Sequence, residues 1–358
     1  MSASSVYADI DLAALRHNLS VVRRHAPGCR IMAVVKSNAY GHGALELACA
    51  LAPGVDALAV ARTEEALALR AAGLHVPLVV LEGPVEDEDL RRSGQAQLQL
   101  TIHHESQLAL LAGYRGTSID CWLKCDTGMH RLGFAPDAVA SAWSALTEMP
   151  SVRAVGLMTH LACADDPEDP MTARQVERMH AVSLGIGAQR SIANSAGILA
   201  WPETHADWIR PGLMLYGVSP LLRRNAADLE LRAVMGLHAR LIAINVIPAG
   251  DTVGYGATWT APEQMPLGVV GIGYGDGYPR HIGPDASVLL RGKRVPVVGR
   301  VSMDMITVDL RGVAAEVGDK VMLWGDGLPV EEVAAWAGTI PYTLLCGVTE
   351  RVERRYRD

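Results

Sequence analysis

Eight short apolar segments, separated by amphipathic stretches, constrain the fold of this chain more than any other feature. The segments span residues 31–36, 57–61, 77–82, 97–102, 119–125, 154–160, 190–194 and 207–210. The stretches 62–72 and 103–113 place apolar residues at helical spacing with charged residues opposite. Alternation of this kind predicts strands and helices around a parallel sheet, and eight such units predict a closed (β/α)8 TIM barrel. A further helix is expected at 11–26, before the first strand.

The sequence changes character near residue 230. Beyond this point β-branched and other apolar residues recur in short runs separated by Gly and Pro, without helical stretches of comparable length. The clearest runs span residues 231–250, 267–273, 295–310 and 320–325. We therefore expect two domains, a barrel in residues 1–230 and a mostly β domain in residues 231–358.

Composition limits the functions open to this chain. Of its 358 residues, 49% are hydrophobic and 20% are charged, which is typical of a globular protein. No apolar run reaches about 18 residues and the start does not resemble a secretory signal, so we expect no membrane span and a cytoplasmic location. Six scattered cysteines show no metal-site spacing, which predicts reduced thiols and no metal. The net charge of −7, without a basic stripe, favours a small-molecule substrate over nucleic acid.

Lys36 stands at the end of the first barrel segment, where the apolar run 31–35 gives way to Ser, Asn, Tyr, Gly and His. Because the carboxyl ends of barrel strands carry the active sites of this architecture, Lys36 is placed for chemistry. Burial between apolar walls lowers a lysine pKa from about 10.4 and leaves a neutral amine that can attack a carbonyl carbon. The alternative is a lysine that extends its ammonium group into solvent.

Several motifs accompany this lysine in both predicted domains. They are AVVKSNAYGHG (33–43), KCDTGMHRLGF (124–134), MTHLACAD (158–165), IANSAG (192–197), IRPGLMLYG (209–217), VGYGATW (253–259), GYGDGYPR (273–280), GRVSMDM (299–305) and PYTLLCGVTERV (341–352). In this order they resemble the motifs of alanine racemases, which are pyridoxal phosphate enzymes that combine a barrel with a C-terminal β domain. The resemblance covers nearly the whole chain.

The resemblance implies a site for pyridoxal 5'-phosphate. Lys36 is expected to carry the cofactor as a Schiff base, and a rigid lysine kept from water suits that role. Arg210 is expected to face the pyridine nitrogen, where a guanidinium that stays charged donates a hydrogen bond and disfavours protonation of the ring. The other expected cofactor-binding residues are Tyr40, Asn194, Ser195, Gly212, Leu213 and Tyr342. Taken singly, Tyr40 could pack the barrel rim and Arg210 could be a surface residue.

Racemisation requires a proton to leave Cα on one face and to return on the other, which two bases accomplish most simply. The resemblance assigns these roles to Lys36 and to Tyr255, a residue of the second domain. A free tyrosine has a pKa of about 10, so it needs help near neutral pH. His160 could supply that help by hydrogen bonding, with Arg210 polarising the histidine. Taken alone, a residue such as His160 is more often a hydrogen-bonded core histidine.

Arg131 is the remaining expected catalytic residue, and the resemblance places it near the substrate carboxylate. The resemblance also implies that Lys124 is carbamylated, and a carbamate can hold an arginine through two hydrogen bonds. A simple Lys124–Asp126 pair is the alternative. The resemblance adds Met303 and Asp304 as substrate-binding residues. The expected residues of a polar entrance to the site are Asp165, Tyr274, Arg280 and Arg300. The alternative for these four is that they are ordinary solvent-exposed loop residues.

The expected function is interconversion of L- and D-alanine by a homodimer in which the β domain of one chain completes the barrel site of the other. A racemase of broader substrate specificity is an alternative, because the sequence does not give the volume of the pocket. A decarboxylase of the same fold type would place an acid at the pyridine nitrogen, and Arg210 argues against it. A non-catalytic pyridoxal phosphate-binding protein would resemble the barrel alone. Both biological roles stay open, because the supply of D-alanine for peptidoglycan and the catabolism of D-alanine would use the same residues.

Overall fold

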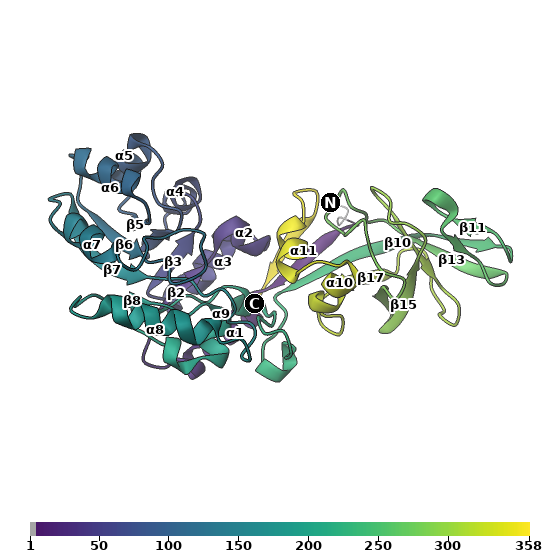
Figure 1. Cartoon of the computed structure of the whole chain (residues 1–358). Coiled ribbons are helices and arrows are strands. Elements are labelled where there is room, and N and C mark those ends of the chain that lie inside the picture. The colour runs from purple at the N-terminus through teal and green to yellow at the C-terminus, as the bar shows by residue number, and fades with distance from the viewer. Residues whose placement is uncertain (1–4) are drawn as a thin grey trace.

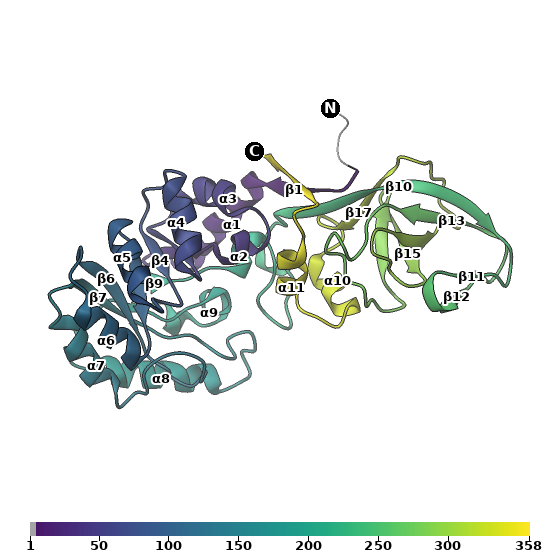
Figure 2. The same ribbon diagram turned by 90° about the horizontal axis from the view of Figure 1, so that it is seen from above.

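The computed structural model describes residues 5–358, which form an elongated molecule with a barrel at one end and a β-rich part at the other (Figure 1). A view from above shows the same separation, with the long strand β10 (Met235–Ile247) running from the barrel side into the β-rich part (Figure 2). This arrangement confirms the predicted fold class.

Eight parallel strands close the barrel and confirm all eight predicted segments. They are β2 (Arg30–Val34), β3 (Ala57–Val60), β4 (Leu78–Val80), β5 (Gln99–Ile102), β6 (Ile119–Lys124), β7 (Val152–Met158), β8 (Arg190–Ser191) and β9 (Trp208–Ile209). The helices of this part are α1 (Leu12–His25), α2 (Lys36–Tyr40), α3 (Ala44–Leu51), α4 (Thr63–Ala71), α5 (Asp87–Gln95), α6 (Glu105–Gly113), α7 (Val139–Thr147), α8 (Met171–Ser183) and α9 (Ser195–Ala200). Short 3-10 turns occur at Ala52–Gly54, Pro202–Thr204, Leu213–Tyr216 and Ala227–Leu229.

Two buried tryptophans, one on β6 and one on β9, pack against each other in the barrel. The rings of Trp122 and Trp208 meet edge to face with centroids 5.7 Å apart. Each indole donates a hydrogen bond, Trp122 to Gln99 at 3.0 Å and Trp208 to Gln189 at 2.8 Å. Gly156 on β7 lies directly against Trp122. The barrel is therefore a packed core, and in this architecture the carboxyl-terminal ends of the strands are the end that carries chemistry.

An eight-stranded sheet forms the β-rich part, in the order β13-β16-β15-β14-β17-β10-β1-β18. Its strands besides β10 are β1 (Tyr7–Asp11), β13 (Met265–Val270), β14 (Ser287–Leu290), β15 (Lys293–Val298), β16 (Ile306–Asp309), β17 (Lys320–Trp324) and β18 (Glu353–Arg357). A two-stranded hairpin, β11 (Thr252–Val253) and β12 (Trp259–Thr260), carries the 3-10 turn Tyr255–Ala257, and two helices, α10 (Val330–Trp336) and α11 (Pro341–Gly347), complete the part.

Strand β1 belongs to this sheet, although the sequence analysis placed all of residues 1–230 in the barrel. It pairs antiparallel with β10 and parallel with β18. Asp11 ends β1 and caps α1 by accepting a hydrogen bond from the Ala14 N–H at 2.7 Å. Because β1 of the sheet runs directly into α1 of the barrel, this junction joins the two parts of the chain.

Several properties concern the whole described chain. None of the helices in residues 5–358 combines the length and apolar character that crossing a membrane requires. All six cysteines are free thiols. The same residues contain no group of three or more His, Cys, Asp or Glu side chains suited to holding a metal ion.

The close contact between Gly156 and Trp122 predicts that a larger residue at position 156 destabilises the protein. A Cβ added at Gly156 would lie 2.6 Å from the Trp122 ring, so Gly156→Ala should lower the free energy of unfolding by about 1–3 kcal/mol through overpacking. The control is Gly113→Ala at the end of α6, where an added Cβ meets nothing within 4 Å. Thermal unfolding of both variants checks this, and equal melting temperatures would contradict the packing account.

Candidate active site

The predicted reactive residues of the barrel gather at the carboxyl ends of its strands. Lys36 follows β2, Lys124 ends β6, His160 lies two residues beyond β7 and Arg210 directly follows β9. Strand β2 pairs with β9, and β6 pairs with β7, so these ends share one face of the barrel. This is the face where barrels carry active sites.

The residues that follow Lys36 adopt an uncommon backbone conformation. Ser37, Asn38, Ala39 and Tyr40 all have φ between 51° and 55°, in the left-handed region. Each non-glycine residue in that region costs about 1–2 kcal/mol, so the surroundings must stabilise the turn. Strain of this kind next to Lys36 is typical of a functional site.

Three side chains that the sequence analysis did not single out hold this turn. Glu65, at the start of α4, accepts a hydrogen bond from the Ser37 N–H at 2.6 Å. From the C-terminal strand β18, Arg354 donates to the Gly41 carbonyl at 2.7 Å and Tyr356 donates to the His42 carbonyl at 3.1 Å. The loop of the expected cofactor lysine is therefore fastened both by the barrel and by the β-rich part of the same chain.

Arg210 is 4% exposed, and its guanidinium group donates into a ring of backbone and side-chain acceptors. It reaches Ser191 Oγ and the Thr159 carbonyl at 2.6 Å each, and the Ile192 carbonyl at 3.2 Å. Burial lowers the pKa of Arg210 to about 10, so the group remains a cation at neutral pH. The arginine is thus a fixed positive charge at the barrel mouth.

His160 lies against this guanidinium, with Nδ1 3.3 Å from Arg210 Nη2. Burial, reinforced by the positive charge of Arg210, holds the pKa of His160 well below its usual value, so the ring is neutral at neutral pH. Because a guanidinium only donates, Nδ1 is the accepting nitrogen and Nε2 carries the proton. The histidine can therefore donate one hydrogen bond through Nε2.

Two lysines share the mouth with these groups. Burial, and then the charges of Arg210, Arg131 and Lys36, lower the pKa of Lys124 to about 8. Burial, and then Arg131, also lower the pKa of Lys36. Lys36, Lys124, Arg131 and Arg210 are called the cationic mouth below. No ion pair joins any of the four to a carboxylate within residues 5–358, including the alternative pair of Lys124 with Asp126.

Hydroxyl and backbone N–H groups cluster beside the cationic mouth. Ser195 Oγ accepts hydrogen bonds from the backbone N–H groups of Gly212 at 2.8 Å and Met214 at 3.4 Å. A Cβ on Gly212 would lie 2.6 Å from the Tyr40 hydroxyl, so only glycine allows that approach. Asn194 orders the segment by capping α9 through the Gly197 N–H at 2.9 Å. These groups suit a phosphate, and the nearby cations suit its charge.

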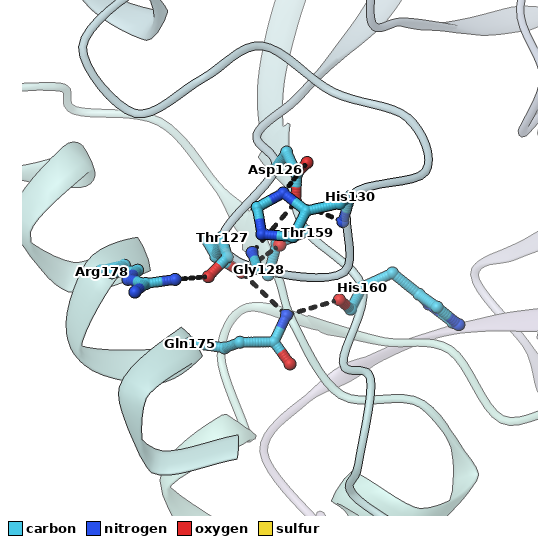
Figure 3. Close-up of polar contacts among 8 residues, drawn as sticks. All are labelled: Asp126, Thr127, Gly128, His130, Thr159, His160, Gln175 and Arg178. Carbon is cyan, nitrogen blue, oxygen red and sulfur yellow. Dashed lines mark hydrogen bonds and ion pairs between the residues drawn. The ribbon is translucent and has the colours of Figure 1, made fainter. Parts of the chain in front are cut away.

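Arg131 is exposed on a turn that follows β6. Asp126 Oδ1 accepts hydrogen bonds from the Gly128 and His130 N–H groups at 3.0 Å each, and its Oδ2 lies 3.1 Å from His130 Nδ1 (Figure 3). Asp126 therefore stabilises the turn that presents Arg131.

The remaining expected residues divide between the two parts of the chain. Tyr342, on α11, lies beside Tyr40 with ring centroids 5.7 Å apart and ring planes tilted by 39°. Burial, and then the charge of Asp165, raise the pKa of Tyr342 to about 12, which places Asp165 on the same side of the barrel. Leu213 begins the 3-10 turn directly after Gly212 and is buried.

Tyr255 does not reach the cationic mouth within one chain. It begins the turn between β11 and β12, at the end of the β-rich part away from the barrel, and is 71% exposed (Figures 1 and 2). Arg300 lies beside this turn, because a Cβ on Gly256 would be 3.0 Å from its Nη1. Arg280 and Arg300 also line a hollow of about 680 Å³ in this part.

Met303, Asp304 and Tyr274 lie in the β-rich part as well. The Gly275 N–H donates to the Met303 carbonyl at 2.9 Å, and the Met303 side chain is 52% exposed. Asp304 is paired with Arg351 at 2.7 Å, a partner that the sequence analysis did not anticipate. One chain thus carries two separate sets of expected site residues.

Comparison with known proteins identifies the family. Residues 10–220 match the family model "Alanine racemase, N-terminal domain", and residues 234–356 match "Alanine racemase, C-terminal domain". The alanine racemase of Nitrosococcus oceani is 53% identical over 97% of this chain and 98% of its own length, and that of Halorhodospira halophila is 50% identical over 98% and 97%. The crystal structure of the biosynthetic alanine racemase from Pseudomonas aeruginosa covers 99% of both chains with a TM-score of 0.96 and 45% identity. The chain therefore belongs to the alanine racemase family.

Proposed function

We propose that this protein interconverts L- and D-alanine and that it uses pyridoxal 5'-phosphate as its cofactor. The observation that carries the proposal is the cationic mouth, in which Lys36, Lys124, Arg131 and Arg210 lie without an ion-pair partner in residues 5–358. Such a site favours ligands with negative charges, and both a phosphate ester and an amino-acid carboxylate supply them. Family membership supports the same function.

The residues around the mouth fit this cofactor. Lys36 would attach it, Arg210 would hold its ring nitrogen, and Tyr342 would lie at its edge. The phosphate would bind among Tyr40, Asn194, Ser195, Gly212 and Leu213, whose hydroxyl and N–H groups adjoin one another. When bound, pyridoxal phosphate supplies an electron-withdrawing ring that makes the Cα proton of an attached amino acid easier to remove.

Arg210 supports racemisation over decarboxylation. Its pKa of about 10 keeps it a cation, so at a ring nitrogen it would donate a hydrogen bond without transferring the proton. An acid at this position would protonate the ring, as expected for a decarboxylase of the same fold type. The β-rich part with Tyr255 argues equally against a protein that only binds the cofactor.

Two bases would move the proton. Lys36 Nζ would act on one face of Cα, and its lowered pKa increases the fraction of free amine. Tyr255 Oη would act on the opposite face. The Nε2–H of neutral His160 would donate to that oxygen and so stabilise the phenolate, with Arg210 fixing the tautomer of the histidine.

A homodimer with shared sites would bring these bases together. Within one chain Tyr255 lies at the end of the β-rich part away from the barrel (Figure 1). Large apolar side chains are exposed in the same part, among them Tyr255 and Met303, which is typical of a surface that another chain covers. Tyr255 of the partner subunit would then complete each mouth, and the isologous geometry would give two sites.

The remaining assignments follow from this arrangement. Arg131 would hold the substrate carboxylate, while Met303 and Asp304 would limit the space for its side chain. Asp165, Tyr274, Arg280 and Arg300 would form a polar entrance. A small pocket favours alanine, although each extra methylene costs only about 1–3 kcal/mol, so a broader racemase is the second candidate. The free thiols agree with the proposed cytoplasmic location. There the enzyme would either supply D-alanine for peptidoglycan or consume it in catabolism.

Incubation of the purified protein with each alanine enantiomer tests the function directly. Chiral chromatography should show the opposite enantiomer forming from either one, with serine and lysine as comparison substrates. Lys36→Ala should abolish this activity and the visible absorbance of lysine-bound pyridoxal phosphate, because the attaching amine is gone. The proposal fails if the wild type converts neither enantiomer, or if Lys36→Ala keeps the absorbance.

Mixing two inactive variants tests the shared sites. In a hybrid of Lys36→Ala and Tyr255→Phe subunits, one site carries both changes and the other carries none. After subunit exchange at equal amounts, half of the dimers are hybrids, so activity should recover to about a quarter of the wild-type value. Each variant alone is the control. Absence of any recovery, despite exchange shown by mass spectrometry, would rule out shared sites.

Lys124 is proposed to be carbamylated. Its amine attacks CO2, a C–N bond forms as one C=O π bond opens, and a proton leaves to solvent. The resulting carbamate anion would lie beside the cations of the cationic mouth, whose positive charges would stabilise it. Because only the neutral amine reacts, and the pKa of Lys124 is about 8, occupancy should increase as the pH rises through that value. A carbamate signal in 13C NMR with labelled bicarbonate, absent in Lys124→Ala, is expected; a bare amine throughout would refute it.

A further inference from the structure

A buried glutamine outside the cationic mouth connects two loops that lead into it. Gln175 lies on α8 and is 0% exposed. Its Oε1 accepts a hydrogen bond from the Ala162 N–H at 2.8 Å. Its Nε2 donates to the His160 carbonyl at 2.9 Å and to Thr127 Oγ1 at 3.1 Å (Figure 3). Both N–H groups and the oxygen of this amide are therefore engaged.

The orientation of the Gln175 amide follows from its partners. A backbone N–H can only donate and a backbone carbonyl can only accept, so the Ala162 N–H must face the amide oxygen and the His160 carbonyl must face the amide nitrogen. These two backbone groups flank Leu161. Gln175 thus holds the chain directly after the end of β7, at the residue whose ring contacts Arg210.

On its other side Gln175 reaches the turn that carries Arg131. Thr127 is 1% exposed, and its hydroxyl also bonds the hydroxyl of Thr159 at 2.7 Å. From the same helix, Arg178 donates to the Thr127 carbonyl at 2.8 Å. The turn is therefore tied to α8 at two points and to the end of β7 at a third (Figure 3).

We propose that Gln175 is a positioning residue that fixes the turn of Arg131 relative to His160. The inference rests on the proposed function for the roles of these two side chains, one at the substrate carboxylate and the other beside the phenol of Tyr255. Gln175 itself contacts neither ligand. Because a displacement of about 1 Å at reacting groups can lower the rate about 100-fold, a single buried amide in this place can control catalysis.

The chain offers a matched control. Gln107, on α6, is also buried, accepts a hydrogen bond from the His103 N–H at 2.8 Å, and donates to the carbonyls of Glu82 at 3.2 Å and Pro84 at 3.0 Å. It ties the loops after β4 and β5, which carry none of the expected catalytic residues. Its Nε2 also lies 3.2 Å from His103 Nε2. Replacing either glutamine by methionine removes one hydrogen bond accepted from a backbone N–H and those donated by the amide nitrogen, without adding charge.

The test compares Gln175→Met with Gln107→Met in the holoenzyme. Hydrogen exchange measured by mass spectrometry should become faster in residues 126–134 and 160–162 of Gln175→Met and stay at the wild-type rate there in Gln107→Met. The kcat/KM for alanine should fall about 10- to 100-fold in Gln175→Met, with a raised KM, because Arg131 is displaced. A purely structural defect would reduce the amount of active protein and leave KM unchanged.

A second pair keeps the test decisive if Gln175→Met does not fold. Thr127→Val removes the hydroxyl that Gln175 binds, whereas Thr127→Ser retains it, so only the valine variant should raise KM. The proposal is overturned if exchange in the two segments is unchanged, if it rises without loss of kcat/KM, or if both glutamine variants lose activity alike. If the wild type does not racemise alanine, the proposed function fails, and the exchange comparison by itself decides whether Gln175 ties the loops.

Discussion

The site depends on an electrostatic imbalance at one end of the barrel. Lys124 and Arg210 are buried, Lys36 and Arg131 lie beside them, and no carboxylate forms an ion pair with any of the four in residues 5–358. Burying cations without a carboxylate in direct contact is costly, and that cost appears as lowered pKa values for the two lysines and for Arg210. Negatively charged ligands would offset it, so the proposed phosphate, carboxylate and carbamate would each be favoured at the cationic mouth.

The fold supports this imbalance with ties from outside the mouth. The left-handed turn after Lys36 is stabilised by Glu65 from the barrel and by Arg354 and Tyr356 from the C-terminal strand. The chain after β7 and the turn of Arg131 meet at Gln175. In each case tertiary hydrogen bonds fix a strained or exposed loop. Through Arg354 and Tyr356, the β-rich part of a chain contributes to its own barrel site as well as to the proposed site of a partner.

The sequence was sufficient to predict the architecture, because eight apolar runs separated by amphipathic stretches have few other solutions. Strand β1 was missed because its partners lie more than 200 residues away in the sequence. Residues such as Glu65 and Gln175 also escaped notice, since their importance lies in tertiary hydrogen bonds that no local pattern reveals. The pairing of Asp304 with Arg351 was hidden for the same reason.

The central claim is that Lys36 and Tyr255 serve opposite faces of the same carbon. Deuterium incorporation at Cα, measured by mass spectrometry for Tyr255→Phe in D2O with each alanine enantiomer, tests it most directly. The account predicts that one enantiomer still exchanges its α-hydrogen with retained configuration, through Lys36, while the other does not and racemisation stops. Equal loss of exchange for both enantiomers would contradict a base that serves only one face.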